Sequence, residues 1–153
     1  MKKYNLVSNT ISSEELNKLS RWIKSAKKLT MGPLSELFEK KFSNTIKRKY
    51  SIFVNSGSSA NLLIAKSLLE SGYLRNKKII APALSWSTTI MPFEQMGYDV
   101  NLCDCDPSNL GLNISHLEKL CKEIKPSCII LVHVLGHSNN MKEILRICKK
   151  YKI

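Results

Sequence analysis

The chain has 153 residues, 43% of them hydrophobic and 24% charged, which is the composition of an ordinary soluble globular protein with a core of its own. No apolar run approaches the roughly 18–20 residues that span a bilayer, and the polar start of the chain lacks a secretory signal, so a cytoplasmic protein is expected. The net charge of +12 is carried mainly by lysines spread along every predicted helix, with few arginines, which favours solvated helix faces over a nucleic-acid-binding surface.

Two amphipathic helices are expected at the start of the chain. Ser12 and Ser13, together with Glu15, form a capping signal for a helix that runs to about Lys28. After the break at residues 30–32, Pro33 suits the first turn of a second helix. Both helices carry apolar residues at helical spacing, namely Leu16, Leu19, Trp22 and Ile23 in the first and Leu34, Leu37, Phe38 and Phe42 in the second. We expect residues 1–29 to form an N-terminal helical segment and residues 30–153 to form the larger domain.

From Tyr50 onward, short apolar runs alternate with helical patterns. The expected strands cover residues 50–54, 77–81, 98–103 and 127–134, and the expected helices cover 60–69, 86–96, 115–124 and 139–151. The strands are apolar throughout rather than alternating, so both of their faces should be buried. This order predicts an α/β fold with three α-β-α layers around a largely parallel sheet. The sequence stops directly after a predicted helix, where another strand should begin, so we expect the domain to be incomplete at its C-terminus.

The cysteines and histidines do not form the spacing of a known metal site. The five cysteines are odd in number and include no C-x-x-C pair, so we expect mostly buried free thiols rather than disulfides or zinc ligands. His133 and His137 have H-x-x-x-H spacing, but Gly136 and a predicted strand end lie between them, where helical metal ligands do not fit. We expect no bound metal. Instead, His137 lies at the carboxyl edge of the sheet and is a candidate substrate-binding residue.

The turn after the first predicted strand is the strongest candidate for ligand binding. Residues 55–61 follow that strand and begin a helix, and ligands of open α/β sheets bind at the carboxyl ends of the strands. Gly57 leaves room for a ligand to approach the backbone, while Ser58 and Ser59 add hydroxyls to the free N–H groups of the first helical turn. This pattern predicts a phosphate site, although a plain serine-capped helix has the same residues.

A second segment at the same edge of the sheet contains a large aromatic ring. Trp86 stands among small hydroxyl residues after the second predicted strand. Its ring is placed to lie flat on a planar heterocycle while the neighbouring turn holds the phosphate of that ligand. The alternative is that Trp86 covers the hydrophobic core.

Together these segments resemble a known enzyme family. Residues 54–62 (with Ser56-Gly57-Ser58-Ser59), 81–89 (with Ser85-Trp86-Ser87) and 132–137 are similar to the DegT/DnrJ/StrS-type sugar aminotransferases, which are fold-type-I enzymes that use pyridoxal 5'-phosphate (PLP). Residues 31–33 with 38–42, and the loop 104–114, fit the same family. The resemblance runs from about Thr30 to the end of the chain.

The resemblance implies roles for particular residues. Gly57, Ser58 and Ser59 would bind the PLP phosphate, Trp86 would stack on the pyridine ring, and Met31 and Gly32 would lie near the substrate entrance. The lysine that holds PLP, and the acidic residue for its pyridine nitrogen, would lie beyond Ile153, so no catalytic residue is assigned within the chain.

The resemblance leaves the reaction open. The base rate of the family favours transfer of an amino group from glutamate to a keto-sugar nucleotide, in the biosynthesis of a polysaccharide or another glycan, by a homodimer. The amino-acid sequences of the segments around Gly57 and Trp86 also resemble a subgroup of PLP-dependent sugar 3-dehydratases. In part of that subgroup a histidine replaces the lysine. A third reading is an inactive truncated remnant.

Overall fold

The computed structural model describes residues 8–153. Within it the chain divides into two compact units, Met1–Phe53 and Val54–Ile153, which we describe separately. The boundary expected after residue 29 lies inside the first unit, and the assignment of residues 30–153 to one family domain stays a prediction.

Residues 8–53 of the first unit form two helices, α1 (Ser13–Ser25) and α2 (Pro33–Thr45). The expected capping box forms: the Ser12 hydroxyl accepts from the N–H of Glu15 at 3.2 Å, and the Glu15 carboxylate accepts from the N–H of Ser12 at 2.7 Å. The helix ends about three residues before the expected Lys28, because Ala26 is extended. Pro33 is the first residue of α2, where its missing N–H costs nothing.

The apolar stripes of the first unit are only partly covered. No residue of α1 is buried, and Leu16 and Leu19 keep 52% and 50% of their surface exposed. In α2 the ring of Phe38 stacks on Phe42 at 5.8 Å and meets Phe53 edge-on at 5.1 Å. This aromatic cluster ties the end of the unit to α2, and the remaining apolar surface is available to a partner.

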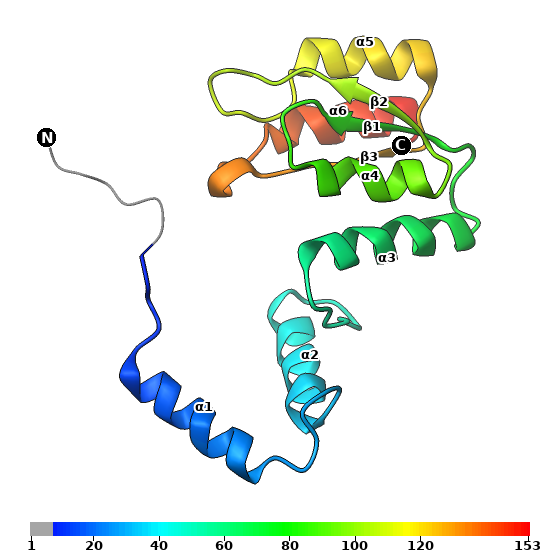
Figure 1. The fold of residues 1–153 in the computed structure, drawn as a ribbon. Coiled ribbons are helices and arrows are strands. Elements are labelled where there is room, and N and C mark those ends of the chain that lie inside the picture. The colour runs from blue at the N-terminus through cyan, green and yellow to red at the C-terminus, as the bar shows by residue number, and fades with distance from the viewer. Residues whose placement is uncertain (1–7) are drawn as a thin grey trace, which may run out of the picture. The chain divides into compact units, whose positions relative to one another are not determined.

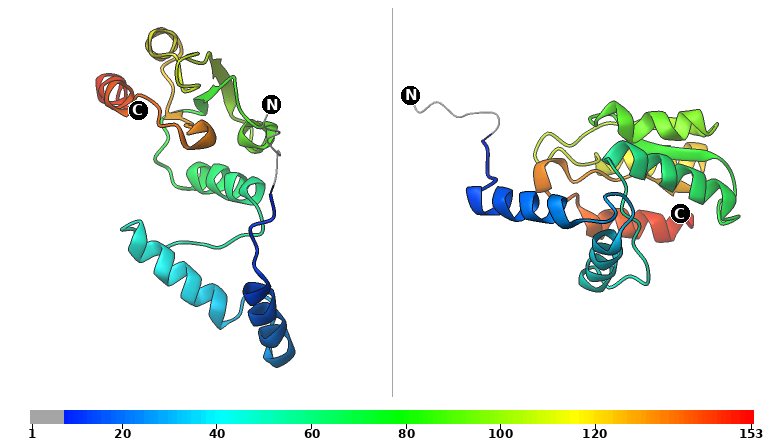
Figure 2. Two further views of the ribbon diagram at one scale, coloured as in Figure 1. Left: turned by 90° about the vertical axis from the view of Figure 1, so that its left-hand side faces the viewer. Right: turned by 60° about the horizontal axis from the view of Figure 1, so that its bottom comes forward.

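The second unit is a three-layer α/β structure (Figures 1 and 2). Its sheet has the order β2-β1-β3, with β1 (Lys78–Pro82) parallel to both β2 (Asp99–Cys103) and β3 (Cys128–Ile129). The helices α3 (Gly57–Glu70) and α4 (Ser87–Gln95) cover one face. The other face is covered by α5 (Ile114–Ile124) and α6 (Met141–Tyr151), with a 3-10 helix, η1 (Val134–Gly136), before α6. The expected fold class is confirmed.

The core follows from the two-residue period of the central strand. Ile79 and Ile80 are consecutive in β1, fully buried, and point to opposite faces. Ile79 packs with Ala65, Phe93 and Tyr98 under α3 and α4. Ile80 joins the cluster under α5 and α6, which contains Cys103, Leu112, Leu117, Cys121, Ile144 and Ile147. A strand buried on both faces needs the continuous apolar run that the sequence has here.

Two expected strands are missing or short, because a strand exists only where a neighbour pairs with it. Residues 50–54 form no strand in the structure, and no described segment bonds to them in a sheet; Ile52 is 70% exposed. The run 127–134 is reduced to Cys128–Ile129, followed by one further bond from the Ile130 N–H to the Ile80 carbonyl at 2.8 Å. After that the chain leaves the sheet toward η1.

Arg75 fixes the ends of the two helices on one face. Lys125 and Lys152 are the left-handed caps of α5 and α6, with φ of 51° and 57°. The Arg75 guanidinium donates to the carbonyls of Tyr151 at 3.1 Å and Lys152 at 2.9 Å, and also to that of Pro126. One side chain therefore satisfies backbone acceptors at both helix ends.

Further features of the second unit bear on its chemistry. Glu118 of α5 accepts from Arg146 at 2.9 Å and Lys150 at 2.7 Å of α6, and these hydrogen bonds lower its pKa to about 2.

All five cysteines are free, but only Cys103 and Cys121 are buried, so burial was over-predicted for the others. Burial raises the pKa of Cys103 to about 12 and that of Cys121 to about 11, which disfavours their reactive thiolates. No helix formed by residues 8–153 is both long and apolar enough to cross a bilayer.

Candidate functional site

The serine and glycine residues of the candidate turn form the first turn of α3. The helix begins at Gly57, three residues earlier than expected, because Ser56 caps it. The Ser56 hydroxyl accepts from the N–H of Ser59 at 3.1 Å. Gly57, Ser58 and Ser59 are therefore adjacent in space at the positive end of a helix that is 14 residues long.

The three residues do not offer the same groups to a ligand. The Ser59 N–H is taken by the cap, and the Ser59 hydroxyl donates to the side-chain carbonyl of Asn55 at 2.6 Å. In contrast, the N–H groups of Gly57 and Ser58 donate to no acceptor among residues 8–153. Gly57 and Ser58 therefore keep backbone N–H groups without a partner among residues 8–153, whereas Ser59 is engaged within the turn.

Gly57 has no requirement inside the protein that only glycine can meet. Its φ is not positive, and a Cβ built on it has no atom within 4 Å. A side chain would be accepted by the fold, so neither backbone strain nor packing explains the glycine. A missing Cβ at a helix start permits close approach of a ligand to the backbone.

A hydrogen bond to a carbonyl that a proline leaves free connects α3 to α4. Pro92 lies inside α4, has no N–H, and so leaves the Thr88 carbonyl four residues earlier without its helical donor. The side-chain amide of Asn61, in α3, donates to that carbonyl at 3.0 Å. Ser58 and Ser59 then share with Thr88, Met91 and other residues of α4 a hollow of about 230 Å³. The start of α3 is therefore held against α4, and the expected helix at 86–96 tolerates its proline because of this bond.

Trp86 is the residue before α4 and belongs to neither core cluster. Its backbone is extended, it gives α4 no side-chain cap, and 78% of its surface is exposed. The Ser85 hydroxyl donates to the Pro82 carbonyl at 3.2 Å, which holds the bend between β1 and α4. The alternative that Trp86 covers the hydrophobic core is wrong, because a ring in that role is buried.

The two histidines after β3 differ in how they are held. The ring Nδ1 of His133 lies 3.2 Å from the Asn139 backbone N–H, which can only donate. In the neutral ring the proton is therefore on Nε2. His137 ends η1, is exposed, and makes no side-chain hydrogen bond within residues 8–153. Its loop includes Leu135 at φ 51° and Gly136 at φ 83°. The structure places both histidines on the chain that leaves the carboxyl end of β3 and anchors only His133.

Asn139 organises this edge of the sheet and was missed by reasoning from the sequence. Its side chain is 4% exposed, donates to the Val132 carbonyl at 2.8 Å and accepts from the Leu112 N–H at 2.8 Å. A Cβ at Gly111 would lie 2.6 Å from the Asn139 side-chain oxygen, so the loop after β2 must carry glycine there. The glycine at 111, inside an otherwise apolar Leu-Gly-Leu, was the one available signal.

Met31 and Gly32 lie in the first unit, at the start of α2. Met31 is in the left-handed region, with φ 46°, and 83% of its surface is exposed. Gly32 is the residue before α2, and a Cβ there would lie 3.2 Å from the Lys28 carbonyl oxygen, so the loop approaches itself closely. Among residues 8–153 no three His, Cys, Asp or Glu side chains are grouped as metal ligands.

Comparison with known proteins identifies one family model and several relatives that cover nearly the whole chain. The family model described as the DegT/DnrJ/EryC1/StrS aminotransferase family matches residues 9–153. A GDP-4-keto-6-deoxy-D-mannose 3-dehydratase from Yersinia pseudotuberculosis is 36% identical over 150 residues, which is 96% of this chain and 38% of that protein. A 3-oxo-glucose-6-phosphate:glutamate aminotransferase from Bacillus subtilis is 28% identical over 97% of this chain and 32% of its own length.

Among solved structures, an Escherichia coli GDP-4-keto-6-deoxy-D-mannose-3-dehydratase with bound hydrated PLP superimposes with a TM-score of 0.80 and 33% identity. The match covers 97% of this chain and 39% of that chain. The chain therefore spans less than two fifths of the length of each of these three relatives.

Proposed function

Because the chain belongs to the DegT/DnrJ/EryC1/StrS aminotransferase family, we propose that residues 54–153 hold the phosphate and one ring face of PLP in an enzyme that modifies a nucleotide-linked keto-sugar. The observation that carries this proposal is the start of α3. There, the N–H groups of Gly57 and Ser58 have no acceptor among residues 8–153, and the fold itself does not require glycine at position 57. A phosphate dianion is the ligand that such a helix start favours.

The residues present fit the cofactor group by group. The N–H groups of Gly57 and Ser58 and the Ser58 hydroxyl supply donors for the phosphate, while the exposed ring of Trp86 supplies a stacking surface. The Asn61–Thr88 bond fixes the spacing between these two points of attachment. PLP, when bound, supplies the electron sink for chemistry next to the amine or sugar carbon, and the protein orients it.

For the reaction, we propose removal of the 3-hydroxyl of a nucleotide-linked 4-keto-6-deoxy sugar. The support is the identity of 36% to a 3-dehydratase, against 28% to a glutamate-dependent aminotransferase. Aminotransfer to a keto-sugar, with glutamate as donor, is the second candidate and rests on the family itself. The exposed apolar stripes of α1 and α2 support a homodimer as the working form. A cytoplasmic location stays a prediction.

The group that decides between these reactions is not assigned to any residue of the chain. No residue of the chain is assigned as the family's catalytic lysine or as the histidine that replaces it, so we expect residues 1–153 alone to bind PLP without turnover. The check is incubation with PLP, glutamate and GDP-4-keto-6-deoxy-D-mannose, followed by mass spectrometry of the sugar nucleotide. A 3-deoxy or an amino product formed by the chain alone contradicts this expectation.

Binding itself can be measured through Trp86. In a Trp22→Phe variant, Trp86 is the single tryptophan and should be quenched as PLP stacks on it. Pyridoxal, which has the same ring without the phosphate, is the matched ligand. It should bind at least about tenfold more weakly, because charge-assisted bonds to the helix start are lost. Equal affinity for the two ligands, or no quenching by PLP, refutes the proposed phosphate site.

A further inference from the structure

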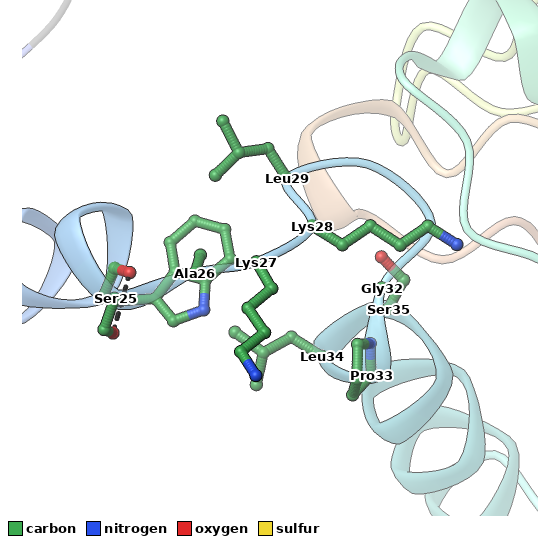
Figure 3. Close-up of a pocket in the computed structure, with 10 residues that line it drawn as sticks. Ser25, Ala26, Lys27, Lys28, Leu29, Gly32, Pro33, Leu34 and Ser35 are labelled. Carbon is green, nitrogen blue, oxygen red and sulfur yellow. Dashed lines mark hydrogen bonds between the residues drawn. The ribbon is translucent and has the colours of Figure 1, made fainter.

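The hollow between the end of α1 and the start of α2 contains no fixed polar group (Figure 3). It has a volume of about 510 Å³ and is lined by Trp22, residues 25–29 and residues 32–35. Figure 3 shows the side chains of Lys27 and Lys28 leaving the loop in different directions, and none of the polar side chains that line the hollow is buried. Its size alone therefore identifies no ligand.

A fixed polar group does occur in the second unit, on the chain that leaves β3. The Nδ1 atom of His133 lies 3.2 Å from the backbone nitrogen of Asn139 and 3.2 Å from its side-chain nitrogen. Both nitrogens carry hydrogen and neither can accept, so Nδ1 is the acceptor. Two donors thus hold one edge of the imidazole ring.

Asn139, which holds the ring, is itself fixed. Its side chain is 4% exposed, its oxygen accepts from the Leu112 N–H at 2.8 Å, and its amide donates to the Val132 carbonyl at 2.8 Å. These two bonds set which end of the amide faces the ring. A rotation of the His133 ring would break its contact with Asn139, so the direction of the ring is set by the fold.

The other ring nitrogen of His133 is available to a ligand. Because Nδ1 accepts, the proton of the neutral ring is on Nε2. The Nε2–H has no acceptor within residues 8–153, and His133 is exposed. Solvent satisfies this donor in the free protein, and a ligand that carries an acceptor can replace the solvent. His133 therefore presents one neutral N–H donor in a fixed direction.

The register of the sheet places His133 beside the segment that leads to Trp86. The Ile130 N–H donates to the Ile80 carbonyl at 2.8 Å, and β1 and β3 are parallel, so the two chains leave the sheet at the same edge. Trp86 follows the first of these strands and His133 follows the second. Figure 1 shows η1 and the start of α4 at this edge. The His133 donor and the exposed Trp86 ring thus belong to neighbouring strand exits.

One acceptor of PLP is left without a partner by the site at the start of α3. The phosphate is assigned there to the Gly57 and Ser58 N–H groups. The aldehyde is the group that reacts with amines, and the pyridine nitrogen donates when it is protonated as part of the electron sink. The remaining acceptor is the oxygen on ring carbon 3, which is anionic as a phenolate and therefore accepts strongly from an N–H donor.

We propose that His133 binds the 3-oxygen of PLP through its Nε2–H, with Asn139 as the positioning residue that holds the ring. The inference rests on the proposed function for the identity of the cofactor, but on the exit of β3 rather than the start of α3 for its residues. It adds a third point of attachment, on the β3 side, to the phosphate donors and the stacking surface of Trp86.

The test replaces His133 by Asn in the Trp22→Phe background, in which Trp86 reports PLP binding. The Asn side-chain oxygen can stand near the position of Nδ1 and accept from the Asn139 N–H, but the Nε2–H donor is lost. The urea midpoint should therefore stay unchanged. The dissociation constant for PLP should rise by about tenfold or more, because a bond to a charged acceptor is removed.

His116→Asn is the matched control. The Nδ1 atom of His116 also accepts a backbone N–H, that of Asp104 at 3.1 Å, at the exit of β2. The same substitution there should leave the affinity for PLP within about twofold. A second ligand, 3-deoxypyridoxal 5'-phosphate, lacks the oxygen in question. It should bind the parent and the His133→Asn variant equally, within about twofold.

Three results overturn the proposal. One is unchanged PLP affinity in a folded His133→Asn variant; another is an equal loss of affinity for PLP and for the 3-deoxy ligand. The third is a fall of the urea midpoint together with PLP affinity, which would show that His133 only holds its loop. Absence of PLP binding to the parent defeats the proposed function as well, whereas binding that is the same in parent and His133→Asn defeats this inference alone.

Discussion

Substitution of Gly57 by Ala should raise the stability of the protein and lower its affinity for PLP. In the free protein the new methyl group meets no atom within 4 Å, and the φ of the residue suits an L side chain. The loss of glycine freedom in the unfolded chain should therefore stabilise the fold by about 0.4–1 kcal/mol. In the proposed site, the same methyl stands where the phosphate would approach the Gly57 and Ser58 N–H groups.

The loss in binding can be worked from the donors affected. Displacing one charge-assisted bond to a phosphate costs about 1.5–3 kcal/mol, or about 10- to 100-fold in dissociation constant. The assay pairs urea unfolding with PLP titration of Trp86 in the Trp22→Phe background. Gly72→Ala is the control: with φ +70° it should destabilise by about 1–2 kcal/mol and leave PLP affinity unchanged.

The expected gain in stability and loss of PLP affinity have opposite signs, which distinguishes a ligand-binding role of Gly57 from a structural one. A glycine needed for packing would lose stability and affinity together when changed to Ala. Unchanged PLP affinity in a stably folded Gly57→Ala variant would falsify the placement of the phosphate at the start of α3.

Three further predictions concern the scaffold. Arg75→Met keeps the aliphatic packing but leaves carbonyls at the ends of α5 and α6 without a donor, so urea unfolding should show a loss of about 1–2 kcal/mol; an unchanged midpoint contradicts the clamp. Asn139→Leu leaves two buried backbone groups unpaired and should cost about 2–4 kcal/mol, against about 1 kcal/mol for removing the neighbouring cap by Asn140→Leu; equal losses would remove the special role of Asn139. The folded pKa of Glu118 lies below its ordinary 4.5, so its contribution to stability is present above that pH and is lost as the pH falls toward about 2. Acid unfolding followed by circular dichroism should therefore show a shallower dependence in this window for Glu118→Gln, and an identical profile would refute the linkage.

The order and type of the elements were largely readable because local signals agree with packing. The capping box at Ser12, Pro33 at the start of α2, and the glycine stops at 72 and 97 all depend on neighbours in sequence. The buried strands were readable because β1 is covered on both faces and so is apolar throughout. The start of α3 was placed late because the serines were read as turn formers, whereas Ser56 uses its side chain as a cap.

What the sequence did not reveal depends on distant segments. The strand expected at residues 50–54 requires a pairing neighbour, and its own apolar pattern contains no information on that neighbour. In the candidate site, Gly57, Ser58 and Trp86 were identified from their place after expected strands, of which only β1, before Trp86, forms. Asn139 was not, because its importance comes from Leu112 and Val132, which the fold brings to it from two different loops.

The Asn61–Thr88 bond has a consequence for the thermodynamics of binding. It joins the helix that carries the phosphate donors to the helix that follows Trp86, within the free protein. The backbone segments that carry the two proposed attachment points are therefore already joined in the free protein, and binding need not bring them together. Affinity then comes from a preorganised pair of contacts, so calorimetry of PLP binding should show little loss of conformational entropy from this part of the chain. An Asn61→Leu variant would have to supply that ordering upon binding, and its affinity should fall although Asn61 itself is assigned no contact with the cofactor.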